Sequence, residues 1–140
     1  MSRGVSIIIT TYNRASILEA TLRSASALSI PEGVRAEILV IDNNCTDSTP
    51  EAVATVAAVS PIPIRRILET QQGLSYSRNR GLREAAFDLV VYFDDDVRVA
   101  PDWIAACLEA VEKLDADCVV GPVSPAFECE VPSYISQRVL

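Results

Sequence analysis

The chain has 140 residues, 49% of them hydrophobic, and a formal net charge of −7 from 12 basic and 19 acidic residues. This length favours a single domain over residues 1–140, and the high apolar content excludes a disordered chain. The acidic balance argues against nucleic-acid binding, which depends on a basic surface that neutralises phosphates. Histidine is absent from the sequence, which excludes serine–histidine–aspartate triads and the commonest zinc sites.

The cysteines show none of the close spacing of a metal or redox motif; they are Cys45, Cys107, Cys118 and Cys129. No secretory leader precedes them, so we expect reduced thiols that are mostly buried as small apolar side chains. No apolar run approaches the roughly 20 residues of a membrane-spanning helix. These features predict a cytoplasmic protein, either free or peripheral at the inner face of the membrane.

The first predicted element is a strand over Val5–Thr10, whose apolar residues run almost without interruption. A strand wetted on one face alternates apolar and polar residues, so this one is expected at the centre of a parallel sheet. A helix follows, because apolar residues up to Leu28 recur at helical spacing. Ser16 and Glu19 have the spacing of a capping box at its start.

The second and third predicted strands are Glu37–Ile41 and Ile64–Leu68, with a helix between them that Pro50 opens. After a turn, a further helix is expected with Ser75 as its N-cap, running to about Phe87.

Leu89–Phe93 is the fourth predicted strand, Pro101 opens the last clear helix, and Cys118–Val120 is a short fifth strand. The alternation of strands and helices predicts an α/β sandwich of three layers, α/β/α, around a mainly parallel sheet.

Three polar clusters directly follow predicted strands, at residues 10–14, 42–44 and 94–96. In an open parallel sheet, ligands bind at the carboxyl ends of the strands, near the point where the strand order reverses. A strand end needs only one capping residue, so three dense clusters exceed structural need. Their convergence predicts a ligand site at this edge of the sheet.

The acidic triplet Asp94, Asp95 and Asp96 is the most specific cluster. Three adjacent carboxylates repel one another at neutral pH, and a divalent cation is the simplest way to relieve that repulsion. Oxygen ligands favour Mg²⁺ or Mn²⁺, which take further oxygens from water and from a substrate diphosphate. The alternative is a solvated loop that caps the next helix. The position directly after a buried strand, with two companion clusters, favours the ligand.

The other clusters leave alternatives open. Asp42 follows a strand of aliphatic residues and can accept a hydrogen bond from a nucleobase or ribose, or form an Asx turn or helix cap. Tyr12 suits stacking on a base or half-buried packing, and Arg14 suits a phosphate contact or solvated surface. Residues 73–81 open a helix whose free N–H groups attract an anion, with arginines that reinforce this or merely decorate one face.

Together these motifs resemble family 2 glycosyltransferases of the GT-A, nucleotide-diphospho-sugar transferase fold. The matching segments are Val5–Arg14, Val40–Asp47, Gly73–Gly81 and Tyr92–Asp96, in order. The resemblance implies transfer, with inversion, of a sugar from a nucleotide-diphosphate sugar, above all a UDP-sugar, to a saccharide or lipid-linked acceptor. Such enzymes serve cell-wall or polysaccharide biosynthesis. The resemblance also implies Mn²⁺ or Mg²⁺, which neutralises charge on the departing diphosphate.

The resemblance further implies a nucleotide-sugar pocket lined from several strand ends by Thr10, Thr11, Tyr12, Arg14, Asp42, Asn43, Arg78, Asp94 and Asp95. Within it, Asp42 would read the base and Arg78 would lie near the ribose or diphosphate. Asp94 and Asp95 would approach the ribose and sugar, and Asp96, with Asp94, would hold the metal. Asn43 departs from the second aspartate that many relatives carry at this position.

The family's general base is an acidic residue well beyond the acidic triplet, and only Glu128 and Glu130 follow the last predicted strand. No base is assigned. We therefore expect the donor-binding half of a larger catalytic domain, truncated on the acceptor side, whose exposed sheet edge favours a homodimer.

The competing hypothesis is a non-catalytic nucleotide-sugar-binding or assembly module, which would bind its nucleotide without turnover. A sugar nucleotidyltransferase would need a glycine-rich loop after the first strand, and a dehydrogenase would need a G-x-G-x-x-G motif. The sequence carries neither.

Overall fold

The computed structural model describes residues 4–127 and 129–131. Strands and helices alternate along these residues, which confirms the predicted α/β class. The elements are β1 (Gly4–Thr11), α1 (Ala15–Ser26), β2 (Arg35–Asp42), α2 (Thr49–Ala57), β3 (Ile64–Leu68), α3 (Leu74–Glu84), β4 (Leu89–Phe93) and α4 (Trp103–Leu114).

The strands of the described chain form a parallel sheet in the order β3-β2-β1-β4. β1 lies at its centre, and Val5–Ile9 are fully buried there, as the apolar run predicts. The chain adds β2 and β3 on one side of β1 and then returns to add β4 on the other. The strand order therefore reverses at β1. In this register Thr11 pairs with Asp42 and Ile9 with Phe93, so the carboxyl ends meet at one edge.

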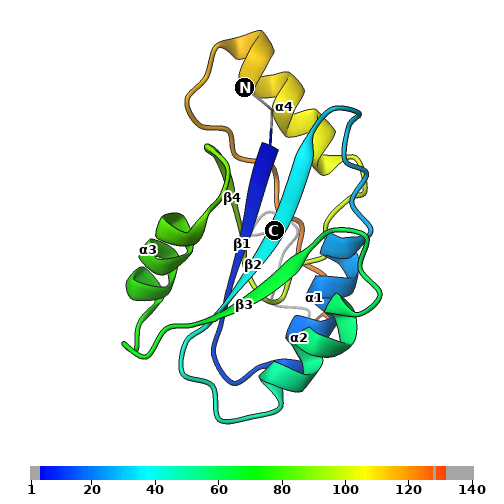
Figure 1. Cartoon of the computed structure of the whole chain (residues 1–140). Helices are drawn as coiled ribbons and strands as arrows, with labels where there is room; N and C mark the ends of the chain where they lie inside the picture. Colours follow the sequence, from blue (N-terminus) through cyan, green and yellow to red (C-terminus); the bar gives the residue numbers. More distant parts are fainter. Residues whose placement is uncertain (1–3, 128, 132–140) are drawn as a thin grey trace.

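Helices cover both faces of the sheet and complete the three predicted layers (Figure 1). α1, α2 and α4 pack on one face, where Leu18 and Ile104 belong to the larger apolar core. α3 covers the other face, over a smaller cluster of Ile8, Leu39, Ile41 and Ile67. Gly81 allows the close approach of α3, because a Cβ there would lie 2.5 Å from Cγ2 of Ile8.

The predicted capping box of α1 is wrong. Arg14 occupies the N-cap position, so Ser16 lies inside the helix, and Glu19 pairs with an arginine one turn later. The N–H of Ala15 instead donates to Asp47 in the loop after β2, at 2.9 Å. A contact between segments far apart in the sequence replaces the local cap. Pro50, by contrast, does lie in the first turn of α2, as predicted.

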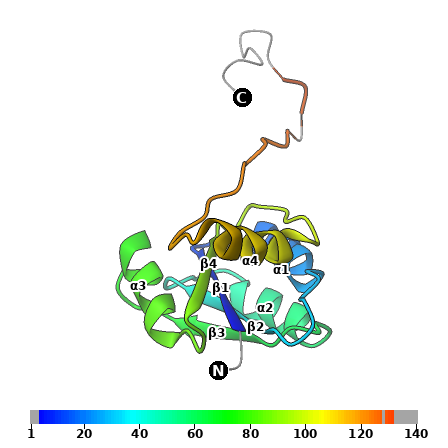
Figure 2. The same ribbon diagram turned by 90° about the horizontal axis from the view of Figure 1, so that it is seen from above.

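Three expectations in the second half of the chain need correction. Gly73, not Ser75, is the N-cap of α3. α4 begins two residues after Pro101, which lies in the turn before it. The predicted strand Cys118–Val120 is absent from the described residues: this segment has no strand structure, and the chain beyond Gly121, which still lies beside Trp103, runs away from the sheet (Figure 2).

The cysteines of the described chain are free, but they are less buried than expected. Cys45 and Cys107 are half-buried, whereas Cys118 and Cys129 are exposed. Burial raises the pKa of the Cys107 thiol, which therefore stays protonated at neutral pH. Within the residues described, no helix has both the length and the apolar character needed to cross a membrane.

Candidate functional site

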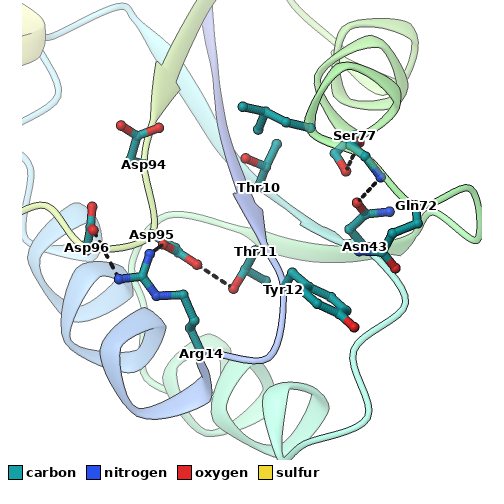
Figure 3. A pocket seen from close by; sticks show the side chains of 12 residues that line it. Thr10, Thr11, Tyr12, Arg14, Asn43, Gln72, Ser77, Asp94, Asp95 and Asp96 are labelled. Carbon is teal, nitrogen blue, oxygen red and sulfur yellow. Dashed lines mark hydrogen bonds and ion pairs between the residues drawn. The ribbon is translucent and has the colours of Figure 1, made fainter.

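The carboxyl ends of β1, β2 and β4 frame an open pocket of about 440 Å³ (Figure 3). It lies where the strand order reverses, which is where parallel α/β sheets bind ligands. Its lining comes from three strand ends and the start of α3, and comprises Thr10, Thr11, Tyr12, Arg14, Asn43, Gln72, Gly73, Leu74, Ser77, Asp94, Asp95 and Asp96. The structure thus brings all but two of the predicted site residues together. Asp42 and Arg78 are the two outside the lining.

Asp42 is buried beside the pocket, with both carboxylate oxygens held by the protein. Oδ2 pairs with Nη1 of Arg66 at 2.7 Å, and Oδ1 accepts the backbone N–H of Cys45 at 2.8 Å. The second bond is local, as in the alternatives left open above, but it reaches three residues along the loop and not the two of an Asx turn. The ion pair with Arg66 joins β2 to β3 and had no signal in the sequence.

Asn43 connects the end of β2 to the loop that leads into α3. Its side-chain NH₂ donates to the carbonyls of Glu69 and Gln71, at 3.1 and 2.8 Å. Its Oδ1 accepts the N–H of Gly73 at 2.8 Å. All the polar atoms of this side chain are therefore engaged, and they hold the loop that forms one wall of the pocket.

Part of that wall was not predicted residue by residue: Gln72 lies outside the predicted motifs, and Leu74 and Ser77 were included only as members of the helix start 73–81. The glycine at position 73 is the feature of the sequence that could have indicated this wall. It allows the backbone φ of 141° directly before the helix, which suits only glycine. The helix start contributes N–H groups beside the pocket, which favours an anion there. Tyr12 is 50% exposed and Leu74 is 53% exposed, so both offer apolar surface for a flat ring.

The three aspartates after β4 lie in different environments. Asp95 is buried; its Oδ2 accepts the Thr11 hydroxyl and its Oδ1 accepts Nη1 of Arg14, both at 2.8 Å. The side chains of Asp94 and Asp96 are 69% and 48% exposed. The three carboxylates directly beyond β4 are thus exposed, buried and exposed in turn, with Asp95 and Asp96 in the turn that follows the strand.

Two arginines partly neutralise the triplet. Nη2 of Arg14 lies 3.1 Å from Oδ2 of Asp96, and Nη2 of Arg78 lies 3.8 Å from Oδ1 of Asp94. Arg14 is thus paired with two carboxylates, while its side chain remains 44% exposed in the lining of the pocket. The protein itself relieves much of the repulsion that we expected a cation to relieve, but one formal negative charge remains.

A metal ion would find two accessible carboxylates here, those of Asp94 and Asp96. Over the described ranges, no three acidic, cysteine or histidine side chains converge into a complete protein site. Mg²⁺ commonly uses only one or two carboxylates and completes its shell with water and substrate phosphate. The residues present fit a metal that arrives with a diphosphate.

The loops after β1 and β2 hold one another in place. Oδ1 of Asn13, which has a φ of 52°, accepts the N–H of Thr46 at 2.7 Å. The N–H of Asn13 donates to Sγ of Cys45 at 3.3 Å. Burial raises the pKa of the Cys45 thiol, so it remains neutral. These contacts fix the loop that carries Tyr12 and Arg14 into the pocket.

The fold and the position of the pocket indicate the class of protein to which this chain belongs. The solved structures that this chain resembles are GT-A glycosyltransferases. The family model described as "Glycosyl transferase family 2" matches residues 6–139, and the chain belongs to this family.

Curated relatives agree with this assignment. The chain is 30% identical over 131 residues to the succinoglycan biosynthesis protein ExoM of Rhizobium meliloti, covering 94% of this chain and 42% of that protein. It is 34% identical over 118 residues to the dolichol-phosphate mannosyltransferase of Pyrococcus furiosus, covering 84% of this chain and 32% of that protein. The chain therefore spans less than half the length of these relatives.

Two solved structures illustrate the match. The mannosyltransferase PcManGT of Pyrobaculum calidifontis, in complex with GDP-Man and Mn²⁺, aligns with a TM-score of 0.69 and 31% identity over 76% of this chain and 32% of that chain. S. aureus TarS in complex with UDP aligns with a TM-score of 0.78 over 92% of this chain and 38% of that chain. At 20% identity the second match shows the fold alone.

Proposed function

We propose that this chain forms the donor-binding part of a glycosyltransferase that takes a sugar from a nucleotide-diphosphate sugar. The observation that carries the proposal is the pocket at the strand reversal, with the exposed carboxylates of Asp94 and Asp96 and the start of α3 at its sides. The complex of PcManGT with GDP-Man and Mn²⁺ supports a nucleoside diphosphate as the bound group.

In this proposal the base and the diphosphate of the nucleotide occupy different parts of the pocket. The base lies against Tyr12, and the diphosphate lies toward Arg14 and the N–H groups that open α3, because a helix start and a guanidinium both attract phosphate. Asp94 approaches the ribose. Asp42 makes no direct contact with the base in this proposal, because both of its carboxylate oxygens are already bonded. It instead holds the end of β2 beside the pocket through its bonds to Arg66 and Cys45.

Asp94 and Asp96 would hold Mn²⁺ or Mg²⁺ together with the diphosphate. When bound, the ion supplies charge neutralisation for the departing diphosphate. The acceptor, a saccharide or a lipid-linked sugar, attacks the anomeric carbon through a hydroxyl from the side opposite the diphosphate. The new bond to the acceptor oxygen forms as the bond to the diphosphate oxygen breaks, the configuration inverts, and the hydroxyl proton passes to a base. We assign no described residue as that base.

Calorimetric titration of UDP and GDP, with and without Mn²⁺, tests the donor site. We expect one nucleotide to bind in a metal-dependent manner, and we expect Asp96→Asn to weaken this binding at least tenfold. Asp102→Asn is the matched control, because Asp102 is exposed, lies outside the pocket and makes no capping bond. Binding that ignores both the metal and Asp96 would contradict the proposal.

Hydrolysis or transfer of a matching sugar nucleotide then separates the enzyme from the alternative, a nucleotide-sugar-binding or assembly module. The module would bind the nucleotide equally well and release no free nucleoside diphosphate from the sugar nucleotide. The relative ExoM, a succinoglycan biosynthesis protein, supports a role in polysaccharide biosynthesis. The proposed location is the one expected from the sequence, in the cytoplasm or at the inner face of the membrane.

A homodimer remains part of the proposal. β4 lies at one edge of the sheet, and Tyr92 on it is 42% exposed. Exposed edge strands promote pairing between copies. Light scattering at rising concentration should show a dimer, and a monomer at high concentration would count against it.

A further inference from the structure

Asp95 differs from both of its acidic neighbours in what it can offer a ligand. Its side chain is 7% exposed, against 69% for Asp94 and 48% for Asp96. Both of its carboxylate oxygens already accept hydrogen bonds, one from the Thr11 hydroxyl and one from Arg14. Its backbone carbonyl accepts the Thr21 hydroxyl at 2.8 Å. A donor molecule would have to break these buried bonds in order to reach Asp95.

Arg14 depends on Asp95 for its position. The guanidinium contacts two adjacent carboxylates, Asp95 through Nη1 at 2.8 Å and Asp96 through Nη2 at 3.1 Å. The pair with Asp95 has one buried partner, whereas the pair with Asp96 is exposed on both sides. Because solvent screens an exposed pair strongly, the contact with Asp95 contributes more to holding the guanidinium.

The two contacts therefore have different consequences. Arg14 contacts both carboxylates in Figure 3. A metal ion that engages Asp96 would displace only the weaker of the two contacts, and Arg14 would stay attached to Asp95. The Thr11 hydroxyl fixes the other oxygen of Asp95, so the carboxylate cannot turn to follow the ligand. Arg14 then remains in the pocket with part of its guanidinium free to donate.

We propose that Asp95 is a positioning residue, not a ligand of the donor: it fixes Arg14 in the pocket and so leaves Asp94 and Asp96 available to the donor and its metal. This role differs from the direct contact with the sugar that the family resemblance implies for Asp95. It rests on the proposed donor site, because Arg14 acts on the nucleotide only if the nucleotide binds there.

The first test follows the guanidinium of Arg14 without any ligand, by NMR of the ¹⁵N-labelled chain, with Arg14→Lys to assign its signals. We expect separate, slowly averaging Nη signals in the wild type and in Asp96→Asn. In Asp95→Asn, which keeps the shape of the side chain but loses the charge and replaces one acceptor oxygen with an NH₂ donor, these signals should average. Averaging in Asp96→Asn but not in Asp95→Asn would overturn the proposal.

The second test compares nucleotide affinities in a double-mutant cycle. Asp95→Asn and Arg14→Gln should each weaken metal-dependent nucleotide binding about tenfold, and the double variant should lose no more than either alone, since one acts through the other. For Arg14→Gln with Asp96→Asn, the two losses should multiply. Losses that multiply in the first pair would show that Asp95 contacts the donor by itself and would overturn the proposal.

Further measurements distinguish a positioning role of Asp95 from a purely structural one. A purely structural Asp95 would lower the melting temperature of Asp95→Asn without changing its nucleotide affinity once folded, and that result also overturns the proposal. Should Asp95→Asn fail to fold, Asp95→Glu shifts the same charge by one methylene and takes its place in both tests. A wild type that binds neither UDP nor GDP contradicts the proposed function, whereas the Arg14 signals report on the positioning role independently.

Discussion

At the scale of single residues, Asp47 shows how one carboxylate can organise two helices beside the pocket. Its Oδ2 accepts the N–H of Ala15 at the start of α1, and its Oδ1 accepts the N–H and hydroxyl of Thr49 at the start of α2. These bonds, that from the Thr49 hydroxyl foremost, lower the pKa of Asp47. A negative charge at two helix starts is stabilising, because both helix dipoles present positive ends there.

Asp47→Ala should therefore lower the free energy of unfolding by about 1–2 kcal/mol, as for the loss of a strong N-cap. Urea unfolding at neutral pH measures this. Asp102→Ala is the matched control: Asp102 is the N-cap residue of α4 but makes no side-chain capping bond, so its loss should cost less than about 0.5 kcal/mol. Equal losses in the two variants would contradict this role of Asp47.

The residues that could be predicted are those whose partners follow from topology. Thr10, Asn43 and Asp94 meet because parallel strands end at the same edge, and hydrophobic runs alone identify those strands. The ion pairs of Asp42 and Arg14 could not be predicted, because their partners lie 24 and 81 residues away in the sequence. Pairing at such separations depends on register, which the pattern of one sequence does not specify.

At the scale of elements, the distance between α3 and the sheet sets one wall of the pocket. Gly81 permits the contact, since a Cβ there would lie 2.5 Å from Cγ2 of Ile8 and 3.3 Å from Cγ1 of Ile41. The sequence predicted this helix but not its closest contact, because a glycine within a helix has no single meaning.

Gly81→Ala should destabilise the protein by about 1–3 kcal/mol, because overpacking outweighs the gain in helix propensity. Chemical denaturation checks the loss. Ile8→Val in the same chain should recover part of it by removing volume at the contact. Asn79→Ala on the exposed side of α3 should cause no loss, and a loss there equal to that of Gly81→Ala would point to the helix itself and not to its packing.

A buried acid ties the opposite end of the sheet together. Oε1 of Glu37 on β2 accepts the Ser6 hydroxyl and the N–H of Ala86, both at 2.7 Å, and its Oε2 lies 3.2 Å from Nη2 of Arg65. Burial by itself raises the pKa of Glu37, but the bonds from Ala86, Ser6 and Arg65 together lower it below its ordinary value of 4.5.

The sign of the pH dependence follows from that lowered pKa. The stability that ionised Glu37 contributes is complete above the unfolded-state pKa and is lost as the pH falls through the folded-state pKa. The free energy of unfolding of the wild type should therefore fall more steeply with acidification below about pH 5 than that of Glu37→Gln. The exposed Glu32→Gln should follow the wild type. Parallel curves for Glu37→Gln and the wild type would contradict the account.

At the scale of the whole molecule, the described chain is a three-layer α/β/α unit that belongs to glycosyl transferase family 2. The strand order β3-β2-β1-β4 reverses at β1, and the pocket lies there, at the carboxyl ends of the strands. The three-layer architecture was predictable, because an alternation of strands and helices allows few parallel arrangements. The unpaired course of residues 115–127 was not, because pairing depends on a neighbouring strand and not on local pattern.

We expect a nucleoside diphosphate to bind at the carboxyl ends of the strands. The most direct test of this expectation is a ¹⁵N-NMR titration of the chain with UDP and GDP in the presence of Mg²⁺, which avoids the broadening caused by Mn²⁺. We expect one nucleotide to shift the amide signals of residues 10–14, 72–77 and 94–96. The amide signals around Glu37 and Ala86, at the opposite end of the sheet, should stay unchanged. Shifts confined to residues outside the pocket, or no shifts with either nucleotide at millimolar concentration, would contradict the account.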